Sequence, residues 1–333
     1  MGKAILCNKK VLVTGGAGFI GSNIVEKLLT QGNYVVCLDN FSTGKRENIE
    51  GFLSDDNFAL LEGDIRDADL CSTAVRDVDV VLHQAALGSV PRSINDPKTT
   101  NDVNIGGFVN MLWAAVNQGV PRFVYAASSS TYGDNNELPK IEERIGMPLS
   151  PYAITKYVNE LYAGVFSKLY GITTIGLRYF NVFGRRQDPE GAYAAVFPKF
   201  ISGFLNHQAP LIHGDGSQSR DFTYIDNVIQ ANELAATTQN PKAFNTVFNV
   251  AYGESNSLND LTTELKRLLS KYDAEIANIE SVYGAERIGD IKHSLASIEK
   301  ARELLGYNPK YNVHQGLQIA IDWYYHKLKS QVP

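Results

Sequence analysis

A tyrosine and a lysine four residues apart are the side chains of this sequence best suited to acid–base chemistry. Tyr152 and Lys156 follow Ser150 and Pro151, which are favourable residues for the cap and the first position of a helix. The spacing therefore predicts that both side chains lie on one face of the opening turns of that helix. A nearby ammonium favours phenolate and lowers the pKa of a tyrosine from about 10 towards neutrality. Tyr152 is thus predicted to act as a general base towards a hydroxyl.

A glycine-rich turn near the start of the chain predicts where a dinucleotide binds. It follows a short apolar run at 11–13, precedes a helical apolar pattern over 22–29, and contains Gly15, Gly18 and Gly21. Glycines at this spacing allow a tight turn, close approach of a pyrophosphate, and close packing of helix on strand. The helix N-terminus then offers N–H donors to the phosphates. Together with a tyrosine base, this arrangement indicates nicotinamide-dependent oxidation of an alcohol.

The preference for NAD or NADP depends on the residues that follow the second predicted strand, 34–38. That strand ends at Asp39, near the distance of about 20 residues at which a carboxylate binds both ribose hydroxyls. Because this carboxylate would repel a 2′-phosphate, the sequence predicts NAD. Lys45 and Arg46 lie close by in the chain, and their positive charges weaken this preference for NAD over NADP.

Composition and charge exclude several classes of protein. The chain has 333 residues, 44% of them hydrophobic, with a net charge of −5 and no basic block, so nucleic acid is not an expected partner. No apolar run reaches the roughly 18 residues that span a bilayer, and no signal-peptide pattern begins the chain, so we expect no membrane contact and a cytoplasmic location. Cys7, Cys37 and Cys71 are predicted to be reduced core thiols. No Cys/His cluster has the spacing of metal ligands, so no metal is expected.

Strand-like and helix-like segments alternate through the first half of the chain. The strand-like segments are 11–13, 34–38, 58–64, 78–86, 123–127 and 173–178, and a long helical stretch covers 103–118. This alternation predicts an α/β protein with a Rossmann-type, doubly wound parallel sheet and a smaller C-terminal α/β substrate lobe. Ligands of such sheets bind beyond the carboxyl ends of the strands. Asp64, Gln84, Ser128 and Asn181 all fall at such ends.

The boundary between the two predicted domains lies where this alternation weakens, after 183. The NAD-binding domain is expected over 1–183, with segments returning near 221–250. The smaller lobe is expected to be discontinuous, over 184–220 and 251–333, and to bind the substrate.

Two amphipathic helices are predicted in the smaller lobe from their apolar spacing. One covers 258–272 and the other covers 295–305. Each follows a serine, Ser257 or Ser294, which is a favourable N-cap.

Ten motifs follow one another in a fixed order along the chain. They are TGGAGFIG (14–21), the DN pair (39–40), GDIRD (63–67), HQAA (83–86), SSSTYG (128–133), PYAITK (151–156), RYFNVFG (178–184), GDGSQSRDFTYIDN (214–227), RIGDIKHS (287–294) and LGYNP (305–309). In these motifs the chain resembles the extended short-chain dehydrogenases/reductases, and within them the UDP-hexose 4-epimerases, over nearly its whole length. It is most similar to the UDP-N-acetylglucosamine (UDP-GlcNAc/GalNAc) 4-epimerases, which share SSSTYG and the run 187–196.

The resemblance implies a reaction and a set of residues for it. Ser128, Tyr152 and Lys156 would be catalytic: Tyr152 would take the proton from the sugar 4-hydroxyl while C4 gives hydride to tightly bound NAD. The 4-keto sugar would then turn over and regain hydride on its opposite face. The residues implied in NAD binding are Gly15, Gly18, Phe19, Ile20, Gly21, Asp39, Asn40, Ser42, Thr43, Gly44, Asp64, Ile65, Gln84, Ala85, Ala86, Tyr152 and Lys156.

The resemblance also implies a binding site for a UDP-sugar. Its residues would be Gly88, Ser89, Ser129, Ser130, Asn181, Gln187, Ala195, Val196, His213, Arg220, Arg287, Asp290 and Ser294. Arg220 and Arg287 would clamp the diphosphate, a task that suits guanidinium groups. In relatives a large tyrosine at the position of Ser294 excludes an N-acetyl group, so the small Ser294 implies reversible conversion of UDP-N-acetylglucosamine to UDP-N-acetylgalactosamine. A pocket that fits the larger sugar also admits UDP-glucose and UDP-galactose, with discrimination of about 1–3 kcal/mol.

Three other functions share parts of this pattern. A sugar-nucleotide 4,6-dehydratase needs an acid and a base where this chain has Ser129 and Ser130. A UDP-uronate 4-epimerase or decarboxylase needs a cation for the C6 carboxylate, for which Arg92 is a candidate. A regulator that binds NAD without turnover usually lacks the tyrosine or the lysine, and this chain has both.

Relatives form homodimers through a four-helix bundle, and the resemblance implies the same here. The helices would be 104–118 and the one that carries Tyr152. The apolar run Phe108, Met111, Leu112 and Ala115 is compatible with such an interface and equally with a core.

Overall fold

The computed structural model describes residues 5–188, 196–286 and 292–329. Its centre is a seven-stranded sheet in the order β11-β6-β5-β4-β1-β2-β3, and every neighbouring pair is parallel. The strands are β1 Lys10–Thr14, β2 Tyr34–Asp39, β3 Phe58–Glu62, β4 Val80–His83, β5 Arg122–Ser128, β6 Thr173–Tyr179 and β11 Thr246–Val250. The predicted doubly wound parallel sheet is therefore confirmed.

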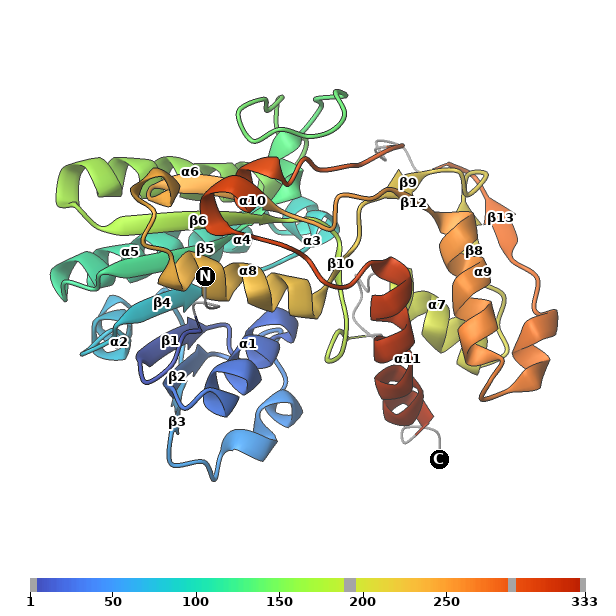
Figure 1. Ribbon diagram of the computed structural model, residues 1–333, viewed down its shortest axis with the longest axis horizontal. Coiled ribbons are helices and arrows are strands. Elements are labelled where there is room, and N and C mark those ends of the chain that lie inside the picture. The colour runs from blue at the N-terminus through green and yellow to red at the C-terminus, as the bar shows by residue number, and fades with distance from the viewer. Residues whose placement is uncertain (1–4, 189–195, 287–291, 330–333) are drawn as a thin grey trace.

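Helices cover both faces of this sheet, as Figure 1 shows. One face carries α1 (Phe19–Thr30), α8 (Ile225–Thr237) and α10 (Glu299–Leu305), and the other carries α2 (Ala68–Ala74), α5 (Phe108–Asn117) and α6 (Pro151–Tyr170). Because side chains alternate along a strand, β1 contributes to both cores: Val11 and Val13 pack on the first side and Leu12 on the second. Burial on both faces explains why the strands read as continuous apolar runs.

A second group of elements lies beside the sheet and forms a smaller lobe, on the right of Figure 1. Its helices are α7 (Val196–Leu205), α9 (Leu258–Leu269) and α11 (Val313–Lys329), which pack on one another. Short strand pairs accompany them: β8 (Leu211–His213) with β13 (Val282–Gly284), β9 (Ser219–Arg220) with β12 (Asn256–Ser257), and β7 (Val182–Phe183) with β10 (Thr223–Tyr224). The chain crosses back to the sheet through α8, β11 and α10.

The helix predicted over 295–305 begins later than expected. α10 starts at Glu299 after the cap residue Ile298, so Ser294 is not a helix cap. The segment before it runs extended, because Ala296 forms an isolated β-bridge with Lys140 and Ser294 donates its N–H to the Ser219 carbonyl at 3.0 Å. The cap predicted at Ser257 is confirmed, since its hydroxyl accepts the N–H of Asp260 at 3.1 Å.

The helix predicted over 103–118 is made of two kinds of turn. Residues Asp102–Gly107 form a π-helical stretch, η3, and α5 continues from Phe108. The apolar run Phe108, Met111, Leu112 and Ala115 is fully buried against the sheet, so these residues form core and not an exposed interface.

The cysteine prediction was correct for two residues of three. Cys37 and Cys71 are buried free thiols, whereas Cys7 is exposed, because it precedes β1 and packs in neither core. Across the described residues, no helix combines the length and the apolar character that crossing a membrane requires.

Candidate active site

A cleft of about 360 Å³ opens beyond the carboxyl ends of the central strands. Ser128, Tyr152 and Lys156 line it, as do all of the predicted NAD-binding residues except Gly44. Eight further residues that the sequence did not single out as site residues also line it: Leu38, Gly63, Leu87, Val103, Ala126, Ala127, Tyr179 and Val182. The structure thus brings the predicted base and the glycine turn, which are more than a hundred residues apart, into one cavity.

The glycine turn fits the pyrophosphate of a dinucleotide. Gly15 has φ +66°, and a Cβ there would lie 2.8 Å from the N atom of Ala85. A Cβ on Gly21 would collide with the Gly15 carbonyl, which explains the close packing of helix on turn. The cap of α1, Gly18, has no side chain that could accept the first-turn N–H groups, and Phe19, Ile20 and Gly21 line the cleft. These donors are free of a side-chain cap and suit an anionic group.

Asp39, at the end of β2, binds the backbone of the glycine turn. Its carboxylate accepts N–H donors of Ala17 at 2.9 Å and Phe41 at 2.8 Å and still lines the cleft. Burial raises the pKa of Asp39, and the backbone hydrogen bonds oppose that rise. A Cβ on Gly44 would lie 2.9 Å from both carboxylate oxygens. A glycine at this position therefore leaves room for the Asp39 side chain, although Gly44 itself does not line the cleft.

The two basic residues that could have favoured NADP are engaged elsewhere. Lys45 forms an ion pair with Asp188 at 2.9 Å, and Arg46 forms one with Glu62 at 2.5 Å. Neither residue lines the cleft among the described residues. Asp39 thus lines the cleft, and within the described part of the chain neither Lys45 nor Arg46 pairs with its carboxylate, in agreement with the prediction of NAD.

Asp64 belongs to a charged cluster at the rim. It accepts two hydrogen bonds from the Arg66 guanidinium, at 2.8 and 3.0 Å, and one from the Asn40 amide at 2.7 Å. The hydrogen bonds from Arg66 lower the pKa of Asp64 to about 2. Asp64 is consequently an ionised acceptor at any working pH.

Tyr152 faces Ser128 across the cleft. Ser128 accepts the hydroxyl of Ser130 at 2.9 Å and its backbone N–H at 3.2 Å, which leaves its own proton to donate to Tyr152. Burial raises the pKa of Tyr152 and the hydrogen bond from Ser128 lowers it, with burial the larger effect. The predicted lowering of this pKa by Lys156 is therefore wrong for the site as described.

The direction of the Lys156 ammonium explains this result. Nζ donates to the Ala126 carbonyl at 2.8 Å, and burial lowers the pKa of Lys156 to about 8. The neighbouring His83 is a core residue: its Nδ1 lies 2.9 Å from the Thr14 hydroxyl, and burial, with the charge of Lys156, lowers its pKa to about 3. His83 is therefore a weak base, and it is not among the described residues that line the cleft.

Replacing Lys156 by Met should stabilise the fold. Lys156 is 3% exposed, and the drop of its pKa from 10.5 to about 8 corresponds to about 3 kcal/mol against carrying the charge. Loss of the bond to Ala126 offsets about 1 kcal/mol of that gain. The remaining gain of about 2 kcal/mol is present below pH 8, where folded and unfolded lysine are both charged. It shrinks between pH 8 and 10.5, where only the unfolded lysine keeps its proton.

Urea unfolding across this pH range, with both proteins freed of NAD, measures the difference. NAD must be absent because a ligand of the folded state would stabilise the two proteins unequally. The exposed Lys168 of the same helix provides the control, Lys168→Met, for which we expect little change. A Lys156→Met protein that is less stable than wild type at neutral pH would contradict the argument.

Asn104, which the sequence did not single out, connects two segments next to the cleft. It lies in the π-helical η3, accepts the Leu87 N–H at 2.7 Å, and donates to the Thr155 hydroxyl at 3.1 Å. It thereby joins a cleft-lining segment to α6 immediately before Lys156. π-Helical turns often occur at functional sites, but no composition signal distinguishes them from α-helix.

Two of the predicted substrate residues line the cleft, Gly88 and Asn181. Asn181 and Ser89, the neighbour of Gly88, hold positive φ values of +34° and +114°, which are strained for residues with a side chain. Ser89 caps α3 (Val90–Asn95) by accepting the N–H of Arg92 at 3.2 Å. Strain of this kind concentrates at functional sites, which supports the prediction for both residues.

Four predicted substrate residues are not among the described residues that line the cleft. Ser129 begins the short helix η4 (Ser129–Tyr132), and Ser130 is bonded to Ser128 rather than pointing into the described cleft. The Gln187 amide bridges the Val182 carbonyl at 3.0 Å and the Tyr324 hydroxyl at 3.2 Å. Val196 packs at the start of α7.

Three more of the predicted substrate residues, His213, Arg220 and Ser294, lie in the smaller lobe. His213 lines a second cavity of about 40 Å³, and its Nδ1 lies 3.2 Å from the Ala285 carbonyl. Arg220 donates to the carbonyls of Ser219 and Lys292, each at 3.0 Å. Ser294 pairs with Ser219 through its backbone. Ala195, Arg287 and Asp290 lie outside the described residues.

A buried carboxylate, Asp221, holds the segments around Arg220 together. It is fully buried and accepts the N–H groups of Tyr252 at 3.1 Å, Gly253 at 3.1 Å and Ala296 at 3.2 Å. Burial raises the pKa of Asp221 to about 7 in spite of these donors. Its carbonyl also accepts the Asn181 amide at 2.9 Å, so Asp221 connects the rim of the cleft to the smaller lobe.

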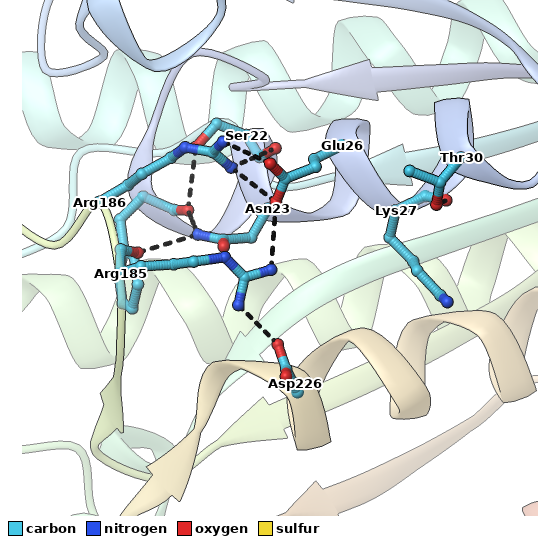
Figure 2. A network of polar contacts seen from close by, with 9 residues as sticks. Ser22, Asn23, Glu26, Lys27, Thr30, Arg185, Arg186 and Asp226 are labelled. Carbon is cyan, nitrogen blue, oxygen red and sulfur yellow. Dashed lines mark hydrogen bonds and ion pairs between the residues drawn. The ribbon is translucent and has the colours of Figure 1, made fainter. Parts of the chain in front are cut away.

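Two arginines fasten the segment after β7 to the helix of the glycine turn, as Figure 2 shows. Arg186 binds Glu26 of α1 at 2.7 Å, and Arg185 bridges Glu26 and Asp226 of α8, at 3.2 and 2.8 Å. Asn23 of α1 donates to the Arg185 carbonyl at 3.0 Å. Burial raises the pKa of Glu26, but the two arginines more than offset this and leave it lowered. Arg185 and Arg186 thus hold the segment after β7 against α1, the helix that follows the glycine turn.

Comparison with known proteins places this cleft in a family. Residues 11–251 match the NAD dependent epimerase/dehydratase family. A putative UDP-glucose 4-epimerase of Methanocaldococcus jannaschii is 38% identical over 94% of this chain and 97% of its own length. A UDP-N-acetylglucosamine 4-epimerase of Methanobrevibacter ruminantium, solved in complex with UDP-N-acetylmuramic acid, is 39% identical with a TM-score of 0.89, covering 97% of this chain and all of the other.

A third relative bears on the cofactor. The UDP-glucose 4-epimerase of Thermus thermophilus, solved in complex with NAD, is 33% identical with a TM-score of 0.82 over 95% of this chain and 99% of the other. NAD agrees with the uncapped helix N-terminus, the carboxylate at Asp39 and the engaged state of Lys45 and Arg46. The chain therefore belongs to the NAD-dependent epimerase/dehydratase family, as a UDP-sugar 4-epimerase of the extended short-chain dehydrogenase/reductase type.

Proposed function

We propose that this protein interconverts UDP-N-acetylglucosamine and UDP-N-acetylgalactosamine by inverting C4 of the sugar. The observation that carries the proposal is the small size of the residues where the sugar would lie: Gly88 lines the cleft, and Ser294 stands where related enzymes use tyrosine to exclude an acetamido group. One structural relative bears the name of this activity and was solved with another UDP-sugar that carries an N-acetyl group.

In the proposed reaction, Tyr152 exchanges a proton with the sugar 4-hydroxyl. Ser128 donates a hydrogen bond to Tyr152, which favours the phenolate form, and Ser130 keeps Ser128 in that orientation. Lys156 holds its ammonium at the Ala126 carbonyl, in the same part of the cleft. Bound NAD supplies the hydride acceptor and donor. The residues at the adenosine and pyrophosphate end, Asp39 and the glycine turn, keep it bound between the two half-reactions.

The smaller lobe would hold the nucleotide while the sugar turns. We assign the diphosphate to Arg220, together with Arg287, and the uracil to the small cavity beside His213. Asp221 accepts three backbone N–H groups and so holds the segments next to Arg220 together, which supports a fixed position for this site. We retain the predicted division into a larger domain for NAD and a smaller lobe for the UDP-sugar.

Proton NMR of the purified protein with UDP-GlcNAc or UDP-glucose, and no added NAD, tests the proposal. We expect signals of the galacto-configured product from both, and faster from UDP-GlcNAc. Ser294→Tyr should lower the turnover of UDP-GlcNAc by about 10- to 100-fold relative to that of UDP-glucose, because the tyrosine would occupy the space of the acetamido group. Ser294→Ala serves as the control and should keep the wild-type preference.

Two results would count against this assignment. Faster turnover of UDP-glucose by the wild-type protein would contradict the argument from Ser294 and leave the epimerase chemistry intact. Turnover of UDP-glucuronate alone would favour the uronate 4-epimerase, with Arg92 as the residue to examine first.

We also infer that two copies pair through α5 and α6. The outer side of these helices exposes several large apolar side chains, of which Leu169 is 67% exposed and Leu161 51%. The others are Trp113, Tyr162, Val165 and Tyr170. These residues replace the buried run that the sequence suggested for a four-helix bundle. Sedimentation velocity of the wild-type protein would distinguish a dimer from a monomer.

A further inference from the structure

Three side chains form a closed ring of hydrogen bonds beneath the cleft. The Tyr179 hydroxyl donates to Oε1 of Gln84 at 3.1 Å, Nε2 of Gln84 donates to Oδ1 of Asn232 at 3.2 Å, and Nδ2 of Asn232 donates to the Tyr179 hydroxyl at 2.9 Å. Each residue donates once and accepts once around the ring. Hydrogen bonds that run in one direction polarise and strengthen one another.

The ring joins the floor of the cleft to a helix on one face of the sheet. Gln84 follows β4 and Tyr179 ends β6, and both line the cleft. Asn232 belongs to α8, is 1% exposed, and is not among the described residues that line the cleft. The second Nδ2 proton of Asn232 is donated to the Val228 carbonyl at 2.8 Å, so all of its hydrogen-bonding groups are engaged.

The place of Gln84 makes the ring relevant to the cofactor. β4 lies between β1, which leads into the glycine turn, and β5, which ends at Ser128. Gln84 therefore stands between the pyrophosphate end and the reactive end of the cleft. Because two of its polar atoms are committed to the ring, its amide plane is fixed, and one N–H and one lone pair remain to meet a ligand.

We propose that Asn232 is a positioning residue for NAD, which it holds indirectly by fixing the amide of Gln84 and the ring of Tyr179 in the floor of the cleft. Burial raises the pKa of Tyr179, so its hydroxyl keeps the proton that the ring requires. Asn232 lies 148 residues from Gln84 in sequence, on a helix to which we assign no other role in the reaction.

The rate at which NAD leaves the protein tests this proposal. Asn232→Leu fills the same space but breaks two of the ring's three bonds, and NAD should dissociate about tenfold faster than from wild type, the equivalent of about 1.4 kcal/mol. The amount of NAD retained per protomer after gel filtration should fall accordingly. Neither readout depends on turnover.

A second asparagine of α8 provides a matched control. Asn227 is equally buried, and it binds the backbone of Lys310 and Tyr311 instead of the cleft residues. Asn227→Leu should lower the melting temperature and leave NAD release unchanged. Equal NAD release from Asn232→Leu and Asn227→Leu would overturn the proposal, since the effect would then be a general loss of stability.

Tyr179→Phe keeps the test decisive if Asn232→Leu does not fold. It removes only the hydroxyl, and we expect the same faster release of NAD. If the two residues act through one ring, the double variant will release NAD no faster than either single variant. Additive effects, or a Tyr179→Phe protein that retains NAD as wild type does, would overturn the proposal.

Discussion

Tyr152→Phe is expected to lower kcat for 4-epimerisation by about 10²- to 10⁴-fold, the usual contribution of a general acid–base group. The variant keeps the ring that fills this part of the cleft and loses only the hydroxyl that Ser128 contacts. Retention of NAD and the KM for the UDP-sugar should therefore change little. A loss confined to kcat indicates that the hydroxyl acts in the transition state and not in binding.

Tyr157→Phe is the matched control for this prediction. Tyr157 lies five residues further along α6 and is not among the described residues that line the cleft. Its variant should turn over UDP-sugars as the wild type does. A Tyr152→Phe protein within tenfold of wild-type kcat would mean that another group moves the proton. Ser128 would then be the first alternative, because it is the polar side chain that faces the same point of the cleft.

The features that the sequence predicted well are local ones. Ser150 caps α6 with its hydroxyl 3.1 Å from the Ala153 N–H, and the turn at Gly15 has the positive φ that its motif requires. Parallel strands then place their carboxyl ends at one edge of the sheet, so residues that end different strands, such as Asp39 and Ser128, meet in one cleft. Local patterns, such as a helix cap and a glycine turn, together with the rule on the carboxyl ends of parallel strands, thus suffice to predict the cofactor half of the site.

The features that the sequence could not predict depend on where each side chain is buried. Helical periodicity gave α5 an apolar side, but the same pattern suits a core and a partner, and Phe108 proves to face the core. The spacing of Tyr152 and Lys156 was read correctly, whereas the effect of burial on their pKa values requires the surrounding atoms. Ser294 has the residue type of a helix cap and is instead held extended by Ser219.

Sequence patterns also fail to predict contacts between distant segments. Among these contacts, a buried ion pair behind the active site has the largest expected effect on stability. Arg178 of β6 binds Glu160 of α6 through two hydrogen bonds, at 2.7 and 2.9 Å, and their side chains are only 4% and 7% exposed. Arg178 also donates to the Glu142 carbonyl at 3.0 Å and stacks over the Tyr132 ring. Burial lowers the pKa of Arg178, but the bonds to Glu160 more than offset this and raise it.

Glu160→Gln is expected to destabilise the protein by about 3–5 kcal/mol, because it leaves the Arg178 charge buried and uncompensated. The double variant Glu160→Leu with Arg178→Met removes both charges and should be more stable than Glu160→Gln. Denaturant unfolding of NAD-free proteins measures both values. For comparison, the exposed pair of Arg302 and Glu299, with side chains 48% and 65% exposed, should contribute less than about 1 kcal/mol when Glu299→Gln breaks it.

The same ion pair has a consequence for catalysis that the unfolding experiment alone would not reveal. Glu160 lies one helical turn beyond Lys156, and Arg178 is paired in register with Ala127, the residue before Ser128. We therefore expect the pair to fix the position of α6, which carries Tyr152 and Lys156, relative to the strand that carries Ser128. We expect the double variant to fold and yet to lose kcat, since leucine and methionine pack without the fixed geometry of a bidentate bond. A double variant with wild-type kcat would show that packing of α6 on the sheet positions the base without this pair.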